Sequence, residues 1–291
     1  MARAALRLAQ NVPGEFFVDE TCIDCDQCRK IAPAVFARWD GGEQSFVRAQ
    51  PDDTAGRLRA TMALVTCPTA SIGTTTKIDV RPAVEALPEE IAPDVFFCGF
   101  AAESSFGASS WLVRRPAGNI LVDSPRAAVP LLRRIEALGG VQTLFLTHRD
   151  DVADHAKLRA RFGCERILHT ADVTAGTRDV ERQISGHDTI RLDDDALIIP
   201  VPGHTKGSAA LLIRDQYLFT GDHLWWSGSR GCLHASRDVC WYSWPAQVRS
   251  LERLLDHGFT WILPGHGRPF HTPGPGAMRA EIERLLAALT A

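Results

Sequence analysis

Three cysteines of the chain lie close together, in a spacing that is typical of iron–sulfur chemistry. Residues 22–28 have the sequence Cys-Ile-Asp-Cys-Asp-Gln-Cys, and a further cysteine, Cys67, directly precedes Pro68. In such a spacing three thiolates bind three irons of a cubane, backbone N–H groups point at its sulfides, and the distant cysteine binds the remaining iron. Structural zinc usually takes two separate Cys-x2-Cys pairs, so zinc and a three-iron cluster are the weaker alternatives. The pattern predicts one [4Fe–4S] cluster held by Cys22, Cys25, Cys28 and Cys67.

The residues around these cysteines indicate the elements that must position them. A strand is expected over 15–18, a short helix over 29–36 and a turn at 40–42. Apolar residues at helical spacing predict a helix over 54–66, which delivers Cys67. Over about residues 12–74 the chain resembles single-cluster bacterial-type ferredoxins. The remaining cysteines lack tight spacing and are expected to be small buried apolar side chains: Cys98, Cys164, Cys232 and Cys240.

A second set of chemically active residues lies in four short motifs, each just after a predicted strand. The motifs are Thr147-His148-Arg149-Asp150-Asp151, Pro202-Gly203-His204-Thr205, Thr220-Gly221-Asp222-His223 and Pro264-Gly265-His266-Gly267. Strand ends gathered at one edge of a sheet can bring such side chains to a shared ion, and glycine permits the tight turns that this requires. The motifs therefore predict a metal site.

In this order the four motifs resemble the metallo-β-lactamase superfamily, over about residues 95–289. Residues 119–124 also resemble the early strand-and-aspartate motif of that family. The resemblance implies an α/β fold, a four-layer αββα sandwich. It also implies that His204, Asp222 and His266 are metal ligands, with Asp222 bridging two metals where two are present.

The first motif departs from the family signature His-x-His-x-Asp-His. Aligned without a gap, His148 keeps the first ligand position and Asp150 replaces the second histidine, while Val152 and Ala153 occupy the aspartate and second-site histidine positions. This departure argues against a two-zinc hydrolase of the lactamase or glyoxalase II kind. The flavodiiron branch of the superfamily also has a carboxylate at the second position and binds iron. Since carboxylate-rich sites suit iron better than imidazole-only sites do, iron is favoured over zinc.

Two nearby residues are weaker candidates for the missing second-site ligands. Asp151 and His155 are four residues apart and would share one face of a helix predicted over 151–162. The plainer alternatives are that Asp151 caps that helix and that His155 is a solvated or capping residue. With Val152 and Ala153 at the lost positions, one further metal ion is favoured over two. A complete loss of metal, with the motifs kept as scaffold, stays open.

The spacing of apolar runs and turns divides the chain into a cluster-binding domain at 1–74, a proline-containing linker at 75–94 and a larger α/β domain at 95–291. Helices of the larger domain are expected over 126–138, 151–162, 245–257 and 276–289. Strands are expected over 111–113, 119–122, 143–147, 166–169, 197–200, 209–213, 217–220 and 260–263.

Composition excludes several classes of protein. The chain has 291 residues, a formal net charge of -3 and a hydrophobic fraction of 45%. No charge excess points to nucleic acid, and no apolar run reaches the roughly 18 residues that span a bilayer. The first residues lack an apolar segment of secretory length, so we expect a cytoplasmic protein that binds neither membrane nor nucleic acid.

Three functions remain in view. In the first, a redox enzyme, the cluster receives electrons from a reductase or ferredoxin partner and passes them to a non-haem iron site that acts on a small molecule. The second is a metal hydrolase with a structural or sensing cluster. The third is a non-catalytic electron carrier or redox sensor with a vestigial metal site. Four tryptophans, in Leu224-Trp225-Trp226 and Trp241-Tyr242-Ser243-Trp244, either line a pocket for a planar or apolar ligand or serve only packing.

Overall fold

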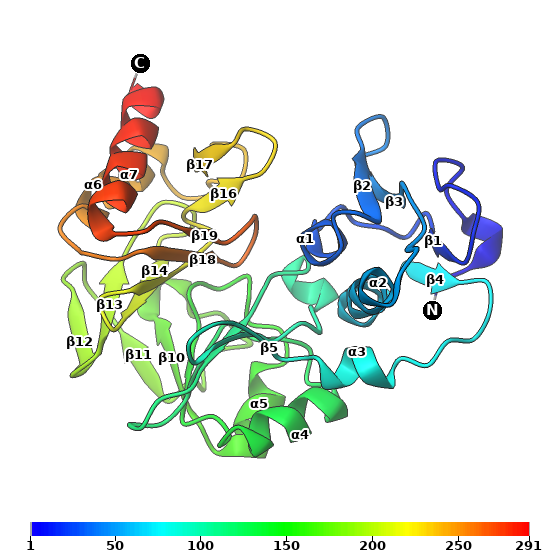
Figure 1. Cartoon of the computed structure of the whole chain (residues 1–291). Coiled ribbons are helices and arrows are strands. Elements are labelled where there is room, and N and C mark those ends of the chain that lie inside the picture. Colours follow the sequence, from blue (N-terminus) through cyan, green and yellow to red (C-terminus); the bar gives the residue numbers. More distant parts are fainter. Residues whose placement is uncertain (1, 291) are drawn as a thin grey trace. The chain divides into compact units, whose positions relative to one another are not determined.

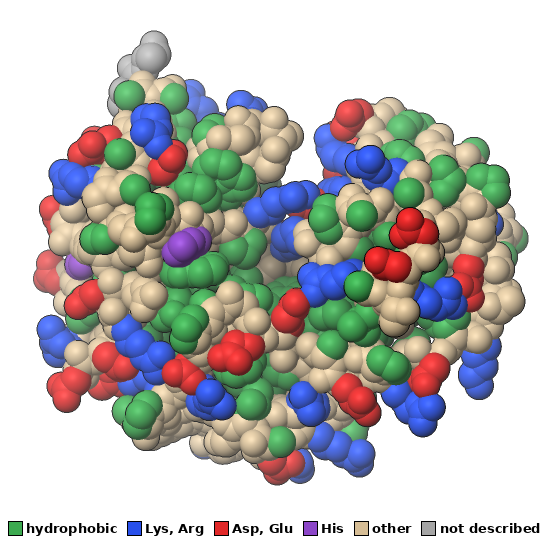
Figure 2. Space-filling model, viewed as in Figure 1, with side chains coloured by type: hydrophobic (Ala, Val, Ile, Leu, Met, Phe, Trp, Pro, Cys, Tyr) green, Lys and Arg blue, Asp and Glu red, His purple; other side chains and the backbone are tan. Residues whose placement is uncertain are grey.

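The computed structural model describes residues 2–290, which form two compact units. The first unit runs to Gln142 and also includes Ala153–Gly163, and the second consists of Thr143–Val152 and the chain from Cys164 onward. Figure 1 shows the elements of both. Within residues 2–290, no helix is long and apolar enough to cross a membrane. Acidic and basic side chains are interspersed over the face drawn in Figure 2.

The cysteine-rich part of the first unit is built from short strands around two helices. Strand β1 (Phe16–Val18) pairs antiparallel with β4 (Ile72–Thr74), and β2 (Phe36–Trp39) forms a hairpin with β3 (Gln44–Val47). A single 3-10 turn, η1 (Ala4–Leu6), precedes them. The β1–β4 pair brings the residues before Cys22 and those after Cys67 side by side, which is how two distant segments come to share one site.

The two helices of this part begin and end where local chemistry dictates. Helix α2 (Thr54–Thr66) matches the predicted range, because the Asp53 carboxylate accepts from the Gly56 N–H at its start and Cys67-Pro68 follows its end. Helix α1 (Gln27–Ile31) is shorter than predicted. It stops before Ala32, because Pro33 disfavours the helical conformation in the residue ahead of it.

The rest of the first unit is an antiparallel meander with helices. Its strands pair in the order β5 (Glu89–Ala92), β6 (Val95–Phe97), β7 (Trp111–Val113) and β8 (Ile120–Val122). Its helices are α3 (Arg81–Glu85), α4 (Val129–Ala137), α5 (His155–Phe162) and the 3-10 turn η2 (Glu103–Ser105). The stretch 75–94, expected to be a linker, thus contains a helix and a paired strand, and the compact units divide elsewhere.

The second unit contains three parallel strands and a six-stranded sheet. The parallel strands are β9 (Thr143–Phe145), β10 (Glu165–His169) and β11 (Arg182–Ile184). The 3-10 turn η3 (Thr170–Asp172) lies between β10 and β11. The larger sheet has the order β12 (Ile190–Asp193), β13 (Ala196–Pro200), β14 (Ala209–Ile213), β15 (Tyr217–Gly221), β18 (Trp261–Pro264) and β19 (Phe270–His271). A small hairpin joins β16 (Trp225–Ser227) to β17 (Cys232–His234).

One face of the six-stranded sheet forms the core of this unit with helices α6 (Trp244–Leu254) and α7 (Pro275–Thr290). Side chains of β13, β14 and β15 pack there against Leu251 and Leu254 of α6 and Met278 and Ile282 of α7. Strands β14 and β15 are buried along their whole length, so the other face of the sheet is covered as well. The mixed α/β class predicted from the sequence is confirmed, with the strand ends that carry the motifs held by a rigid sheet.

Several short strands have no counterpart among the predicted elements. Strands β12, β16 and β19 are only partly buried, so they lack the alternation of buried and exposed residues that marks a longer strand. The expected burial of the spare cysteines holds for Cys98 and Cys164 but is wrong for Cys232, which is exposed in β17, and for Cys240, which is half-buried. These two lie in surface hairpin and loop positions rather than in the core.

Candidate metal centres

The four cysteines predicted to bind a cluster line one cavity in the first unit. Its lining includes Val18, Ile23, Gln27, Ser45 and Ile72 beside Cys22, Cys25, Cys28 and Cys67. None of the four cysteines is in a disulfide. Three thiols therefore come from one loop and the other from the end of α2, as the spacing predicts.

The loop between the first three cysteines is bent by two aspartates in the left-handed conformation. Asp24 and Asp26 have φ angles of 58° and 65°, a region that aspartate tolerates better than most residues. The nearly buried Arg29 guanidinium fixes this shape, because it lies 2.5 Å from the Asp24 carboxylate and 2.5 Å from that of Asp26. It also donates to the Ser45 hydroxyl at 2.7 Å. The two turns allow Cys22, Cys25 and Cys28 to face the same cavity.

The chemistry of this cavity fits an iron–sulfur cluster. The Ser45 N–H donates to Cys22 Sγ at 3.4 Å, and the Ser71 N–H donates to Cys67 Sγ at 3.3 Å. Burial raises the pKa of the Cys25 thiol to about 12, so thiolates here require compensating cations. Iron supplies that charge, and N–H donors to sulfur are typical of cluster sites.

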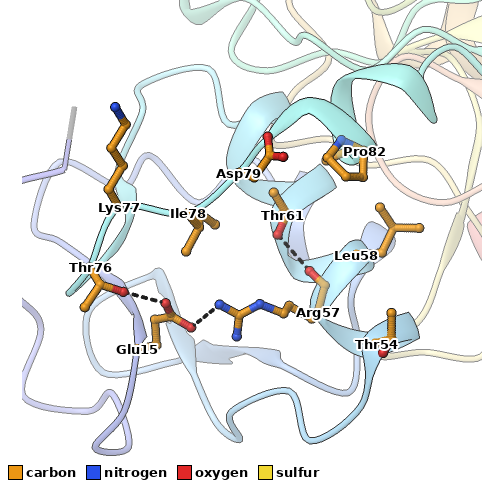
Figure 3. A pocket seen from close by; sticks show the side chains of 11 residues that line it. Glu15, Thr54, Arg57, Leu58, Thr61, Thr76, Lys77, Ile78, Asp79 and Pro82 are labelled. Atoms are coloured by element: carbon orange, nitrogen blue, oxygen red, sulfur yellow. Dashed lines mark hydrogen bonds and ion pairs between the residues drawn. The ribbon is translucent and has the colours of Figure 1, made fainter.

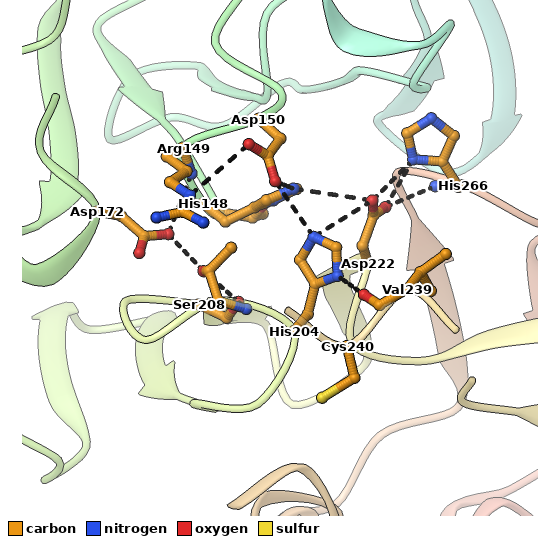
Figure 4. A network of polar contacts seen from close by, with 12 residues as sticks. His148, Arg149, Asp150, Asp172, His204, Ser208, Asp222, Val239, Cys240 and His266 are labelled. Atoms are coloured by element: carbon orange, nitrogen blue, oxygen red, sulfur yellow. Dashed lines mark hydrogen bonds and ion pairs between the residues drawn. The ribbon is translucent and has the colours of Figure 1, made fainter. Parts of the chain in front are cut away.

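The second centre lies in the second unit, where three of the four motifs contribute converging side chains (Figure 4). His148 Nε2 is 3.9 Å from Asp150 Oδ2 and 3.7 Å from Asp222 Oδ2. His204 Nε2 is 3.5 Å from Asp150 Oδ2 and 3.8 Å from Asp222 Oδ2. The ligand atoms of His148, Asp150 and His204 all lie within 4.8 Å of one another, which is close enough to share a metal ion, and Asp222 lies near both imidazoles.

The far side of each imidazole is anchored so that Nε2 points inward. His148 Nδ1 lies 3.0 Å from Thr147 Oγ1, and His204 Nδ1 lies 2.5 Å from the Val239 carbonyl oxygen. A carbonyl only accepts, so His204 carries its proton on Nδ1 and has a lone pair on Nε2. Both Nε2 atoms are buried and make no hydrogen bond. This anchoring is typical of metal-binding histidines.

The ionisation states also suit a cation. Burial lowers the pKa of His148 to about 4, so its imidazole is neutral at pH 7 and can act as a ligand. Burial opposes ionisation of Asp222, but the His266, His148 and His204 imidazoles outweigh it and hold the pKa of that carboxyl well below its usual range. The site therefore presents a neutral His148 imidazole and an anionic Asp222 carboxylate.

Two further residues of the predicted site, His266 and Asp151, lie close to Asp222. His266 Nδ1 is 2.8 Å and 2.9 Å from the two Asp222 carboxylate oxygens, and the His266 N–H donates to Oδ1 at 3.1 Å. Asp151 is buried. One of its carboxylate oxygens, a His148 ring nitrogen and an Asp222 carboxylate oxygen all lie within 4.8 Å of one another. Asp222 thus stands between two sets of possible ligands.

The plainer alternatives for Asp151 and His155 are both wrong. Helix α5 begins at His155 with Asp154 at its N-cap, so Asp151 is neither a cap nor a helical neighbour of His155. His155 is buried rather than solvated, and it belongs to the first compact unit. Among the described residues, the groups of close ligand atoms include Asp151 and leave His155 out.

If a second metal ion binds beside Asp222, Asp151→Asn should remove that ion while the first stays bound. The amide keeps the shape of the side chain but loses the negative charge that a second ion beside Asp222 would need. Metal ions beyond the cluster should be counted by elemental analysis of protein loaded anaerobically. His155→Gln is the matched comparison, and a loss of metal in that variant alone would contradict the assignment.

Sequence reasoning missed the residue that ties two of the motifs together. Asp172, buried after β10, accepts hydrogen bonds from Thr205 Oγ1 at 2.5 Å, the Gly207 N–H at 2.8 Å and the Arg149 N–H at 3.1 Å. It therefore fixes the loop of His148 against the loop of His204. Its place after a strand of the same parallel set was the available signal, but its neighbours match no motif.

The four tryptophans divide between the two uses considered for them. Trp226 stacks on Phe270 with ring centroids 4.2 Å apart, and Trp244 packs against the core of the second unit. Trp225 lies against Gly267, next to His266. Trp241 is 60% exposed, and its ring centroid lies 6.2 Å from that of His204. The backbone N–H of Trp241 donates to the His204 carbonyl. Only part of the aromatic cluster, Trp241 and Trp225, is thus placed to meet a ligand.

The first unit has a surface hollow whose lining contains none of the predicted site residues (Figure 3). Its Arg57 guanidinium is 2.6 Å from the Glu15 carboxylate, which also accepts from Thr76 Oγ1 at 2.8 Å. The charges of Arg57 and Glu15 thus pair with each other, and no predicted motif lines the hollow. It gives no indication of a site.

Comparison with known proteins agrees with the two-part resemblance. Residues 18–74 match the family model described as the 4Fe-4S single cluster domain of ferredoxin I. The hydroxyacylglutathione hydrolase of Anaeromyxobacter dehalogenans is 36% identical over 121 residues, 39% of this chain and 45% of that protein. That of Hyphomonas neptunium is 29% identical over 139 residues, 46% of this chain and 54% of that protein. The chain thus spans about half the length of these curated relatives.

Among solved structures, an archaeal metallo-beta-lactamase superfamily protein from Sulfolobus tokodaii is 15% identical. The match covers 63% of this chain and 80% of that protein, with a TM-score of 0.46. The chain therefore has a segment that matches a single-cluster ferredoxin model, and it is similar over part of its length to hydroxyacylglutathione hydrolases.

Proposed function

We propose that this metalloprotein is a redox enzyme with a [4Fe–4S] cluster on Cys22, Cys25, Cys28 and Cys67 and a non-haem iron site on His148, Asp150, His204 and Asp222. When bound, the cluster would supply single electrons, and the iron would supply a centre whose oxidation state changes during turnover on a small-molecule substrate. Electrons would come from a reductase or ferredoxin partner. We propose that the protein acts in the cytoplasm, with neither nucleic acid nor membrane as a partner.

One observation carries this proposal, the composition of the donor set. Asp150 Oδ2 lies beside both inward Nε2 atoms, at 3.9 Å from His148 and 3.5 Å from His204. This closeness supports the alignment of the first motif, in which Asp150 takes the place of the second histidine. A site that mixes hard oxygen donors with imidazole favours iron, whereas an imidazole-rich site suits zinc.

The chain's own residues hold this site ready for a ligand. The Val239 carbonyl and Thr147 Oγ1 fix the two imidazoles, and Asp172 fixes the loops that carry them. The Arg149 guanidinium lies 3.8 Å from Asp150 Oδ1, so it partly balances the negative charge of that half-exposed carboxylate. Trp241, exposed beside His204, would contact a substrate that reaches the metal.

A metal-dependent hydrolase is the second candidate, and the similarity to hydroxyacylglutathione hydrolases favours it. In that function a bound ion would lower the pKa of a water molecule, and the cluster would be structural or sensory. Against it stand Val152 and Ala153, which occupy the positions of two family ligands. A hydrolase also gains nothing from an electron donor.

Metal identity separates these two candidates. Protein purified anaerobically should contain acid-labile sulfide, and more iron than the cluster alone accounts for, with little zinc. Zinc in the second centre, with hydrolysis of a thioester that chelators abolish, would overturn the redox proposal in favour of the hydrolase. Absence of any metal beyond the cluster would favour the non-catalytic carrier.

A further inference from the structure

A loop from outside the matched ferredoxin segment lies directly against one cluster cysteine. Gly107 has a φ of 79°, and a methyl group placed on it would lie 2.6 Å from Cys25 Cβ and 2.9 Å from Cys25 Sγ. The ferredoxin family match ends at residue 74, so this contact is an addition to that segment. Only glycine allows the backbone to approach the thiol so closely, and the approach leaves no room for water between them.

A polar network joins the same loop to the helix that follows the cysteines. The buried Gln27 side chain donates to the Gly107 carbonyl at 2.6 Å and to Ser109 Oγ at 3.1 Å. Lys30 Nζ donates to the same Ser109 hydroxyl at 3.0 Å. Ser109, itself buried, therefore holds the ammonium group of Lys30 at a defined place beside the loop that packs against Cys25.

The Lys30 ammonium lies close enough to Cys25 for its charge to act on that thiol. Burial raises the pKa of Cys25, and the backbone N–H of Gln27 and the Lys30 ammonium oppose that effect. The same field favours any added negative charge at this thiolate. Reduction adds one electron to a cluster, so a fixed cation nearby makes reduction easier, and more so where water is excluded.

We propose that Ser109 and Lys30 set the reduction potential of the cluster, with Ser109 acting as a positioning residue that holds the Lys30 ammonium beside Cys25. This inference rests on the proposed cluster. It makes the segment after residue 74 part of the cluster's environment, so that the redox property of the ferredoxin segment depends on its junction with the rest of the first unit.

The test is a redox titration of four full-length variants, followed by the EPR signal of the reduced cluster. Lys30→Met should shift the reduction equilibrium about tenfold toward the oxidised form, which is about 59 mV for a one-electron couple. Ser109→Ala should shift it in the same direction by less, because the ammonium stays present but loses its anchor. Lys30→Arg should restore most of the potential. Lys77→Met, in the surface hollow of Figure 3, removes the same charge away from the cluster and should change nothing.

The double variant Lys30→Met with Ser109→Ala decides whether serine acts through lysine. If it does, the double variant has the potential of Lys30→Met alone, whereas additive shifts would overturn the positioning role. Equal potentials in Lys30→Met and the unmodified protein, with sulfide content unchanged, would overturn the proposal while leaving the cluster in place. Lack of sulfide in the unmodified protein would instead refute the proposed cluster, so the two failures are distinguishable.

Discussion

Cys25→Ser is expected to lose the cluster. Acid-labile sulfide should fall from about four per chain to near zero, and the broad visible absorption should bleach, because one iron would lose its thiolate. Gly107 lies directly against Cys25, and clusters of this kind are held by cysteine thiolates, which the hydroxyl of serine does not replace. Sulfide and iron analysis of anaerobically purified protein measures this directly.

Cys232→Ser is the matched control, because Cys232 is exposed in the second unit and belongs to no group of possible ligands. It should keep full sulfide. An unchanged sulfide content in Cys25→Ser would show that the assignment of the cluster ligands is wrong. Where Cys25→Ser folds and keeps its second metal, turnover with physiological electron donors should be lost. Full activity of that variant on the substrate would refute coupling between the centres and support the hydrolase.

Asp222→Asn should cause the largest loss of metal beyond the cluster. Asp222 Oδ2 lies close to both inward imidazole nitrogens, and its carboxylate also contacts His266, so one substitution weakens both sets of possible ligands. Changes to residues that merely support a ligand already cost about 10–100-fold in metal affinity, and a lost ligand should cost at least that much. Metal content after equilibrium dialysis gives the answer.

Asp194→Asn removes an exposed carboxylate of the same unit and should leave metal content unchanged. His204→Ala provides an independent check, since His204 belongs to a different loop. Metal content that stays the same in both Asp222→Asn and His204→Ala would favour a vestigial site, in which the motifs persist only as scaffold.

The sequence was sufficient wherever the chemistry depends on neighbours along the chain. The Cys-x2-Cys-x2-Cys spacing brought three thiols to one cavity, and the helix over 54–66 carried Cys67 to them, as expected. Three motifs at strand ends also converged, because the regular geometry of a sheet gathers such ends at one edge. Residue type and spacing indicate these features, because each motif lies within one turn or at the end of one helix or strand.

The side chain of Asp151 illustrates what spacing alone could not settle. In sequence it suited a helix cap, but the helix begins only at His155, and the carboxylate is buried beside Asp222 instead. Where a short helix starts depends on packing as much as on its own residues, so a few residues of error changed the role expected of both Asp151 and His155.

Only the tertiary structure decided which distant residues complete each site. Asp172 and the Val239 carbonyl orient the loops and the imidazole of the metal site. Gly107 packs against Cys25, and Ser109 accepts from Gln27 and Lys30, from about eighty residues further along the chain. None of these residues belongs to a motif, because each acts through its position rather than through a special chemical group. Such contacts follow from how strands and loops pack, and the free energy of that packing is spread over the whole core rather than encoded in any local stretch of sequence.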